Sequence, residues 1–322
     1  MIFRPNNRGS SHSLKRSFNP DNPCCLVLGG GGARGLAHLG AMQAIAETRV
    51  PVHRVVGVSM GALMGAFCLV EGDPRRAQQN AMQFLDSIEG RKLQSSVSSG
   101  GGLSGSANRR WGTKVLRKLI KHTLVSKLVT SKSLLSGKIL RDLISPLVPD
   151  IDIRDLPTPF QIATVDLHSG RRVMLDSGPL RSAIQASMSI PGIFPAVQHG
   201  DQLLSDIGAY DLVPCDAPPS HQFVKSGPEN VIAVDVGQKI DERTNCNSAL
   251  DAVLRTQFLA EQKMRQISLS KADVVIRPQL RNSEWFDFSS PESIIQAGYN
   301  AAAHSLGLNE LPVVETGTIA SI

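Results

Sequence analysis

Two short apolar segments, each followed at once by a glycine-containing turn and then by a helical pattern, constrain the fold more than any other feature. The first, Cys24 to Leu28, runs into the glycine-rich turn Gly29 to Gly35, and the second, His53 to Val58, runs into Ser59. After each turn, apolar residues recur at helical spacing. Repetition of buried strand, tight turn and helix is typical of a parallel sheet. The sequence therefore predicts an α/β domain.

The rest of the chain continues this alternation. Further buried strands are expected at residues 160–165, 172–175, 231–236 and 273–276, and helices at 179–187, 248–270 and 290–306. The length of 322 residues permits one large domain or two ordinary ones, and the pattern favours one. We expect a disordered basic tail over residues 1–23, a single domain over 24–310 and a C-terminal tail over 311–322.

Positive charge is concentrated in one part of the chain. The formal net charge is +6, but residues 90–141 hold twelve Lys and Arg and no acidic residue, so most of the remaining chain is acidic. Such a concentration indicates attraction to an anionic partner, either nucleic acid or a lipid surface. Residues 95–108 are rich in serine and glycine. We therefore expect a basic, flexible insertion at about 95–132.

Within the insertion, residues 109–132 combine a leucine stripe at helical spacing with flanking lysines. The segment has a single aromatic residue, Trp111, and no recognised nucleic-acid module, so we expect no nucleic-acid partner. A cationic amphipathic helix suits peripheral contact with an anionic membrane. The alternative is that the leucine stripe packs on the sheet and the lysines form a solvated face.

The cysteines and the longest apolar stretch bear on location. The five cysteines include no C-x-x-C pair, which fits reduced thiols in the cytoplasm. The N-terminal residues lack the apolar core of a secretory signal. The longest uncharged apolar stretch, residues 57–70, is shorter than the roughly 18 residues of a membrane span. We expect a cytoplasmic protein, with peripheral membrane association as an option.

The strongest chemical signal is the G-x-S-x-G pattern from Gly57 to Gly61, placed between a predicted strand and a predicted helix. A nucleophilic serine at such a sharp turn needs neighbours without bulky side chains, because the backbone packs closely there. The turn presents the Ser59 hydroxyl at the N-terminus of a helix, whose dipole favours developing negative charge. The alternative is a glycine-rich turn with an incidental serine.

The glycine-rich turn also has two interpretations. Gly30 to Gly35 satisfies the dinucleotide-binding pattern G-x-G-x-x-G, but that use needs an acidic residue at the end of the second strand. No acidic residue lies between Glu47 and Glu71. Consecutive glycine amides instead suit an oxyanion hole, which a serine nucleophile requires. Arg34 has three possible roles: it holds the shape of this loop, it meets an anionic head group, or it is a surface arginine.

A serine nucleophile needs a base. None of the histidines after Ser59 follows a strand in a glycine-bounded loop, and we regard them as incidental: His122, His168, His199, His221 and His304. Asp206 does stand in such a loop, between Leu203 and Gly208.

The glycine-rich loop, the Ser59 turn and the later Asp-x-Gly together resemble the patatin-like phospholipases, in particular the bacterial branch similar to neuropathy target esterase. The segment Ala186 to Pro195 also resembles the one before that family's aspartate. The resemblance implies a three-layer α/β/α patatin-like fold with a mostly parallel central sheet, and hydrolysis of acyl esters of phospholipids or lysophospholipids without a metal or other cofactor.

The resemblance further implies a Ser-Asp dyad without histidine. Ser59 would be the nucleophile and Asp206 its base, and the reaction would pass through an acyl-serine intermediate. The oxyanion hole would be formed by Gly30, Gly31 and Gly32. The residues that would support these motifs are Arg34, Gly35, Gly57, Gly61 and Gly208.

One position departs from the family pattern. Ile207 stands where the family has a glycine after the aspartate. If this position requires a positive φ, a β-branched residue would be strained there. The alternative function is therefore a lipid-binding or regulatory protein that keeps the fold but has little catalytic activity.

Overall fold

The computed structural model describes the central part of the chain with several gaps: residues 18–19, 21–48, 50–100, 131–219, 229–241, 246–280 and 287–308. Residues 109–130 of the basic segment, most of the expected N-terminal tail and the expected C-terminal tail lie outside these residues. What the sequence predicts for them stays a prediction.

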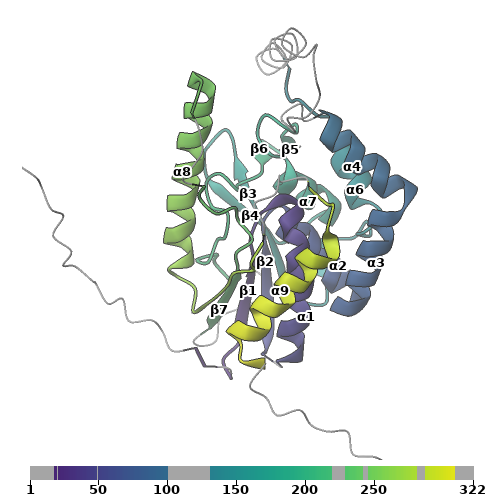
Figure 1. Cartoon of the computed structure of the whole chain (residues 1–322), viewed down its shortest axis with the longest axis vertical. Coiled ribbons are helices and arrows are strands. Elements are labelled where there is room, and N and C mark those ends of the chain that lie inside the picture. The colour runs from purple at the N-terminus through teal and green to yellow at the C-terminus, as the bar shows by residue number, and fades with distance from the viewer. Residues whose placement is uncertain are drawn as a thin grey trace, which may run out of the picture.

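A mostly parallel sheet forms the centre of the molecule (Figure 1). Its strands are β1 (Cys24–Leu28), β2 (Val52–Gly57), β3 (Phe160–Asp166), β4 (Arg172–Leu175), β5 (Val197–His199), β6 (Gln202–Ser205), β7 (Asn230–Val234) and β8 (Val274–Ile276). Their order is β5-β6-β3-β2-β1-β7-β8, and β4 also pairs with β3. The strands β3, β2, β1, β7 and β8 run parallel, whereas β4 and the β5-β6 hairpin are antiparallel.

Helices cover both faces of the sheet. The α-helices are α1 (Ala37–Glu47), α2 (Met60–Glu71), α3 (Pro74–Asp86), α4 (Ile88–Gly100), α6 (Gly137–Ile144), α7 (Leu180–Met188), α8 (Ala249–Leu269) and α9 (Pro291–Ser305). Two short 3-10 helices are η1 (Gly32–Leu36) and η2 (Ile153–Asp155). Figure 1 shows α8 on one side of the sheet and α1, α2 and α9 on the other. The expected α/β architecture with helices around a central sheet is confirmed.

The core consists of clusters on the two faces of the sheet, and alternate side chains of the central strand β1 point into one or the other. Leu26 and Leu28 point into the larger cluster, which α1, α2, α7 and α9 help to build. Cys25 and Val27 point to the opposite face, where Leu212 and Leu269 cover them. All five residues of β1 are buried, as the apolar sequence of the strand predicts.

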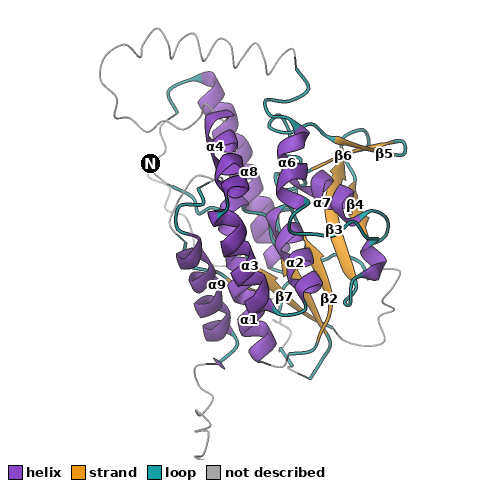
Figure 2. Ribbon diagram, turned by 90° about the vertical axis from the view of Figure 1, so that its right-hand side faces the viewer, coloured by secondary structure: helices purple, strands orange, loops and turns teal. Residues whose placement is uncertain are grey.

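Two glycines allow α1 and α9 to pack unusually closely; Figure 2 shows the two helices side by side. A Cβ atom added to Gly40 would lie 1.9 Å from the carbonyl oxygen of Ile295, and one added to Gly298 would lie 1.9 Å from that of Ala37. The two helix backbones therefore touch where neither residue carries a side chain.

The predicted elements that carry an apolar run lie within two residues of their observed bounds, whereas other parts of the fold, including α3 and α4, were not predicted. Helix α4 continues to Gly100, whereas the sequence predicted a flexible stretch from residue 95. Extending a helix that has already formed costs far less than starting one, so a serine- and glycine-rich end can remain helical. The β5-β6 hairpin was not predicted, although it leads directly into Asp206. No described helix is long and apolar enough to cross a membrane.

Candidate active site

Ser59 occupies a strained turn between β2 and α2. Its φ is 52° and its ψ is −121°, and it is the only non-glycine residue with a positive φ among those described. Such a conformation costs on the order of 1–3 kcal/mol and persists only where the surroundings impose it. A Cβ atom on Gly57 would lie 2.5 Å from Cα of Ala62, and one on Gly61 would lie 2.2 Å from the oxygen of Leu28. Both flanking glycines are therefore required by close backbone packing.

The glycine-rich loop lies against Ser59. A Cβ atom on Gly30 would lie 3.5 Å from Cβ of Ser59. The amide of Gly30 already donates a hydrogen bond to the oxygen of Leu212, at 3.1 Å. The amides of Gly31 and Gly32 have no backbone acceptor in the described part of the chain. Of the three predicted oxyanion donors, Gly30 is therefore the one whose amide a described backbone oxygen already occupies.

Two buried side chains fix the shape of this loop. Arg34 donates from Nε to the oxygen of Val236, at 3.0 Å, so it is a loop-shaping residue and not a surface arginine. His38 was not predicted from the sequence; its Nε2 lies 2.7 Å from the oxygen of Gly29. Burial lowers the pKa of His38 to about 4, so the ring is neutral and donates to Gly29. Gly35 lets η1 pack on α2, since a Cβ atom there would lie 2.3 Å from Cγ of Met60.

Asp206 directly follows β6, in the antiparallel part of the sheet, and its side chain lies near that of Ser59. Its Oδ1 accepts a hydrogen bond from the amide of Gly208 at 2.7 Å. Ser59 and Asp206 are only 7% and 6% exposed, respectively. Burial raises the pKa of Asp206 to about 6, and its interactions with the nearby Ser59 side chain and with the amide of Gly208 partly oppose this effect.

Ile207 fits its position without strain. It does not have a positive φ, and its side chain is fully buried against Val58 and Ala163. The strain considered from the sequence is therefore absent, because this structure places a β-branched residue in a conformation that it tolerates. Ile207 also connects the turn of Asp206 to the residue that precedes Ser59.

The histidines considered as alternatives to Asp206 are not placed to serve Ser59. His168, His199 and His304 are exposed, whereas Ser59 is buried. His122 and His221 lie outside the described residues. Within the described ranges, no three His, Cys, Asp or Glu side chains gather as ligands for a metal ion.

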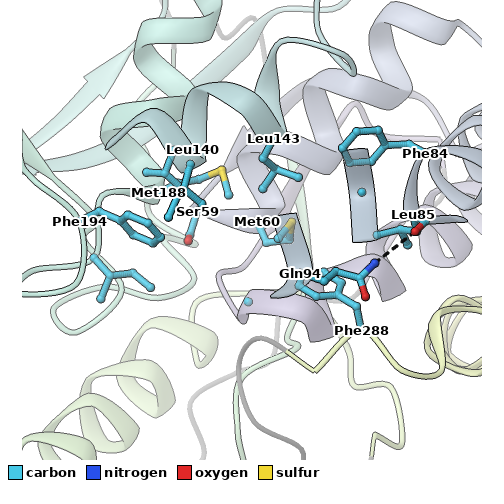
Figure 3. Close-up of a pocket in the computed structure, with 14 residues that line it drawn as sticks. Ser59, Met60, Phe84, Leu85, Gln94, Leu140, Leu143, Met188, Phe194 and Phe288 are labelled. Carbon is cyan, nitrogen blue, oxygen red and sulfur yellow. Dashed lines mark hydrogen bonds between the residues drawn. The ribbon is translucent and has the colours of Figure 1, made fainter. Parts of the chain in front are cut away.

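An apolar pocket of about 70 Å³ opens beside Ser59. Figure 3 shows that Met188, Leu140 and Phe194 lie near Ser59, and that Phe84, Leu85, Gln94 and Phe288 lie farther along the pocket. The lining comes mainly from α3, α4, α6 and the end of α7. Because α3 and α4 were not predicted, this pocket could not be assembled from the sequence.

The fold and the site together define a class: an α/β protein with a buried serine at a strand-to-helix turn, beside a carboxylate, a glycine-rich loop and an apolar pocket. Comparison with known proteins then identifies the family. Residues 26–218 match a family model described as patatin-like phospholipase. The chain belongs to the patatin-like phospholipase family.

Relatives in several organisms agree with this assignment. Patatin-like phospholipase domain-containing protein 7 of Mus musculus is 27% identical over 93% of this chain, and neuropathy target esterase sws of Drosophila melanogaster is 30% identical over 75%. An uncharacterized NTE family protein of Mycobacterium bovis is 30% identical over 59%. The chain spans only 22%, 15% and 43% of these relatives. Among solved structures, VipD from Legionella pneumophila matches 91% of this chain and 68% of its own, with a TM-score of 0.46 and 14% identity.

Proposed function

We propose that this protein is a serine acyl hydrolase that cleaves the acyl esters of phospholipids or lysophospholipids. The observation that carries the proposal is the proximity of the buried side chains of Ser59 and Asp206, which interact strongly enough to affect the pKa of Asp206, beside the glycine-rich loop and an apolar pocket. Membership of the patatin-like phospholipase family and the names of the relatives support a lipid ester as the substrate.

In the proposed reaction Asp206 accepts the proton of the Ser59 hydroxyl as the Ser59 oxygen bonds to the ester carbon. The amides of Gly31 and Gly32 would stabilise the resulting oxyanion; one such donor typically contributes about 2.7–4 kcal/mol. The ester C–O bond then breaks, and Asp206 returns the proton to the departing alcohol. A water molecule next gives a proton to Asp206 and attacks the acyl-serine. The bond between the acyl carbon and the Ser59 oxygen then breaks, Asp206 returns the proton to that oxygen, and the fatty acid is released.

The buried environment of Asp206 supports its role as the base. A carboxylate with its usual pKa of 3.8 is a weak base toward a hydroxyl, and burial raises this pKa to about 6. A higher pKa makes proton acceptance more favourable while the group remains mostly ionised at pH 7. The single hydrogen bond from the amide of Gly208 holds one carboxylate oxygen in place.

The pocket supports an acyl chain as the occupant. Met60, Met188 and Phe194 beside Ser59 are apolar, as are Phe84 and Phe288 farther away. An ester carbonyl placed at Ser59 would therefore extend its hydrocarbon chain among apolar side chains and leave its polar group toward the exit.

A fluorophosphonate probe tests the proposal. We expect it to attach covalently to Ser59 in the wild type, with the modified residue identified by peptide mass spectrometry, because the probe requires an activated serine and an oxyanion hole. Ser87, whose hydroxyl donates to the oxygen of Phe84, should stay unmodified and serves as an internal control. Failure to label Ser59 would favour the alternative of a lipid-binding or regulatory protein. Incubating the labelling-competent enzyme with a panel of phospholipids and lysophospholipids, and measuring released fatty acids, would identify the substrate.

We further propose that residues 109–132 hold the protein at an anionic membrane. Near such a surface each Lys or Arg contributes on the order of 1 kcal/mol. We expect replacement of four basic residues by glutamine, at positions Lys114, Arg117, Lys118 and Lys121, to weaken binding to phosphatidylserine liposomes by at least about 10-fold at low salt. Co-sedimentation measures the binding.

The matched control for the membrane test neutralises four exposed basic residues elsewhere: Arg76, Arg171, Lys239 and Lys263. Equal loss of binding in the two variants would mean that overall charge, and not this segment, attracts the membrane. Unchanged binding in the first variant would overturn the proposal.

A further inference from the structure

We propose that Ser187 is a positioning residue that holds Ser59 in its strained turn, and that the end of α7 to which it belongs sets the placement of Ser59 relative to Asp206. The inference deepens the proposed function, since it concerns the same two residues. It rests on hydrogen bonds that join α7 to both of them.

The hydroxyl of Ser187 lies between two backbone groups. It accepts a hydrogen bond from the amide of Ser59 at 2.8 Å and donates one to the carbonyl oxygen of Ala163, in β3, also at 2.8 Å. Because the carbonyl of Ala163 can only accept, it fixes the hydroxyl proton and directs a lone pair of Ser187 toward Ser59. Ser187 is 0% exposed, so water does not compete for either bond.

The hydrogen bond from the amide of Ser59 to Ser187 supplies an acceptor that α2 itself does not provide. Ser59 is the N-cap of α2, and the first amides of a helix have no acceptor within the helix. At a φ of 52° the residue is also strained. Without Ser187, the buried amide of Ser59 would lose its hydrogen bond, and the turn would be free to relax toward a less strained conformation. Such a relaxation would move the hydroxyl away from Asp206.

Two residues farther along, the same segment holds Asp206. The carbonyl oxygen of Ser189 accepts a hydrogen bond from the amide of Asp206 at 2.9 Å and another from the hydroxyl of Ser205 at 2.5 Å. Met188 lies between the two contacts and lines the pocket. The end of α7 thus contacts both residues of the proposed dyad and the proposed acyl site, and acts as a spacer between two elements that are far apart in sequence.

Ser187→Ala tests the inference, and Thr164→Val is its matched control. Ser187 and Thr164 are both 0% exposed, but the Thr164 hydroxyl donates to the carbonyl of Val173, in β4, at 3.1 Å. The first variant loses the contact with Ser59; the second loses a hydrogen bond from a buried hydroxyl to a backbone oxygen that contacts neither Ser59 nor Asp206. We expect Ser187→Ala to lower kcat for a short-chain ester by about 10- to 100-fold, the range that a small misplacement causes, with KM little changed. Thr164→Val should remain within about 3-fold of the wild type.

The pH dependence of kcat/KM separates positioning from general loss of stability. In the wild type, activity should rise with pH through the pKa of Asp206, at about 6. The interaction with the Ser59 side chain lowers this pKa, so moving Ser59 away from Asp206 should raise it. The profile of Ser187→Ala should therefore shift to higher pH, whereas that of Thr164→Val should coincide with the wild type. The nearly isosteric Ser187→Cys keeps a weak donor and acceptor, so its pH profile should lie between those of the wild type and Ser187→Ala.

The outcomes distinguish this inference from the proposed function. An inactive wild type that does not react with the fluorophosphonate would reject the function itself. An active wild type together with equal rates and equal pH profiles in Ser187→Ala and Thr164→Val would overturn the positioning role alone. If Ser187→Ala does not fold, wild-type behaviour of a folded Ser187→Cys, in rate and in pH profile, would overturn it equally.

Discussion

Hydrolysis of a short-chain p-nitrophenyl ester should be slower by about 10⁴-fold or more in Ser59→Ala, because the nucleophile is removed. In Asp206→Asn it should be slower by about 10²- to 10⁴-fold, because the amide cannot accept the hydroxyl proton. The purified variants are compared by kcat/KM at pH 7.5. Equal activity in the wild type and both variants would reject the proposed mechanism.

Although Asp206→Asn should be less active than the wild type, it should be more stable at neutral pH. The pKa of Asp206 is about 6 in the folded protein, above the usual 3.8, so the folded state holds the proton more tightly than the unfolded state does. Ionisation of Asp206 therefore does not lower the free energy of unfolding below pH 3.8. It lowers it increasingly between pH 3.8 and pH 6, and by the full amount above pH 6. The full cost is about 3 kcal/mol.

Asparagine has the same shape and avoids this cost. We expect Asp206→Asn to raise the free energy of unfolding at pH 7.5, as measured with urea, and to leave it nearly unchanged at pH 4. Gly208 can still donate to the asparagine oxygen, so the turn is retained. A variant that is less stable than the wild type at pH 7.5 would show that Asp206 supports the fold more than burial penalises it.

The second large effect concerns the contact between α1 and α9. Replacing glycine by alanine inside a helix normally stabilises it by about 1 kcal/mol. In Gly298→Ala, however, the new methyl group would stand 1.9 Å from the backbone oxygen of Ala37, which cannot rotate away. The helices must separate, and we expect the free energy of unfolding to fall by about 3 kcal/mol.

Gly137→Ala is the control for this effect. Gly137 is also buried and helical, but the nearest atoms to its added methyl group are side-chain atoms of Pro195 and Gln185, at 3.2 and 3.3 Å. Its stability should stay within about 1 kcal/mol of the wild type. Urea unfolding of both variants measures the difference, and equal stabilities would show that the helices adjust without cost.

Elements with a continuous apolar run were predictable, including the three-residue edge strand β8, whereas the polar strands of the β5-β6 hairpin were not. The five residues of β1 and the apolar part of β3 are buried on both faces, so their sequence is apolar throughout. The hairpin strands β5 and β6 have only three and four residues, and Gln198, His199 and Gln202 make them polar. Their pairing arises from a turn at Gly200, with a φ of 55°, and from the edge of β3. No local pattern reports such pairing.

The same distinction applies to the site. Ser59 could be selected because its constraints are local: a strand, a helix and two glycines. Asp206 was selected through a family resemblance, since its position depends on the hairpin. Ser187 and His38 act through single contacts with backbone groups distant in sequence, and a serine or histidine in a helix gives no sign of such a contact. Likewise, the amide of Gly30 differs from the other loop amides because it donates to the backbone oxygen of Leu212, which is distant in sequence.

The backbone conformation of Ser59 has a consequence for protein engineering. Glycine adopts a φ of 52° without steric cost, so Ser59→Gly would relieve strain that the natural side chain maintains. A library selected only for resistance to heat would enrich this replacement and, with it, molecules that lack the hydroxyl. Selection for a more robust version of this protein must therefore retain a readout of the serine itself.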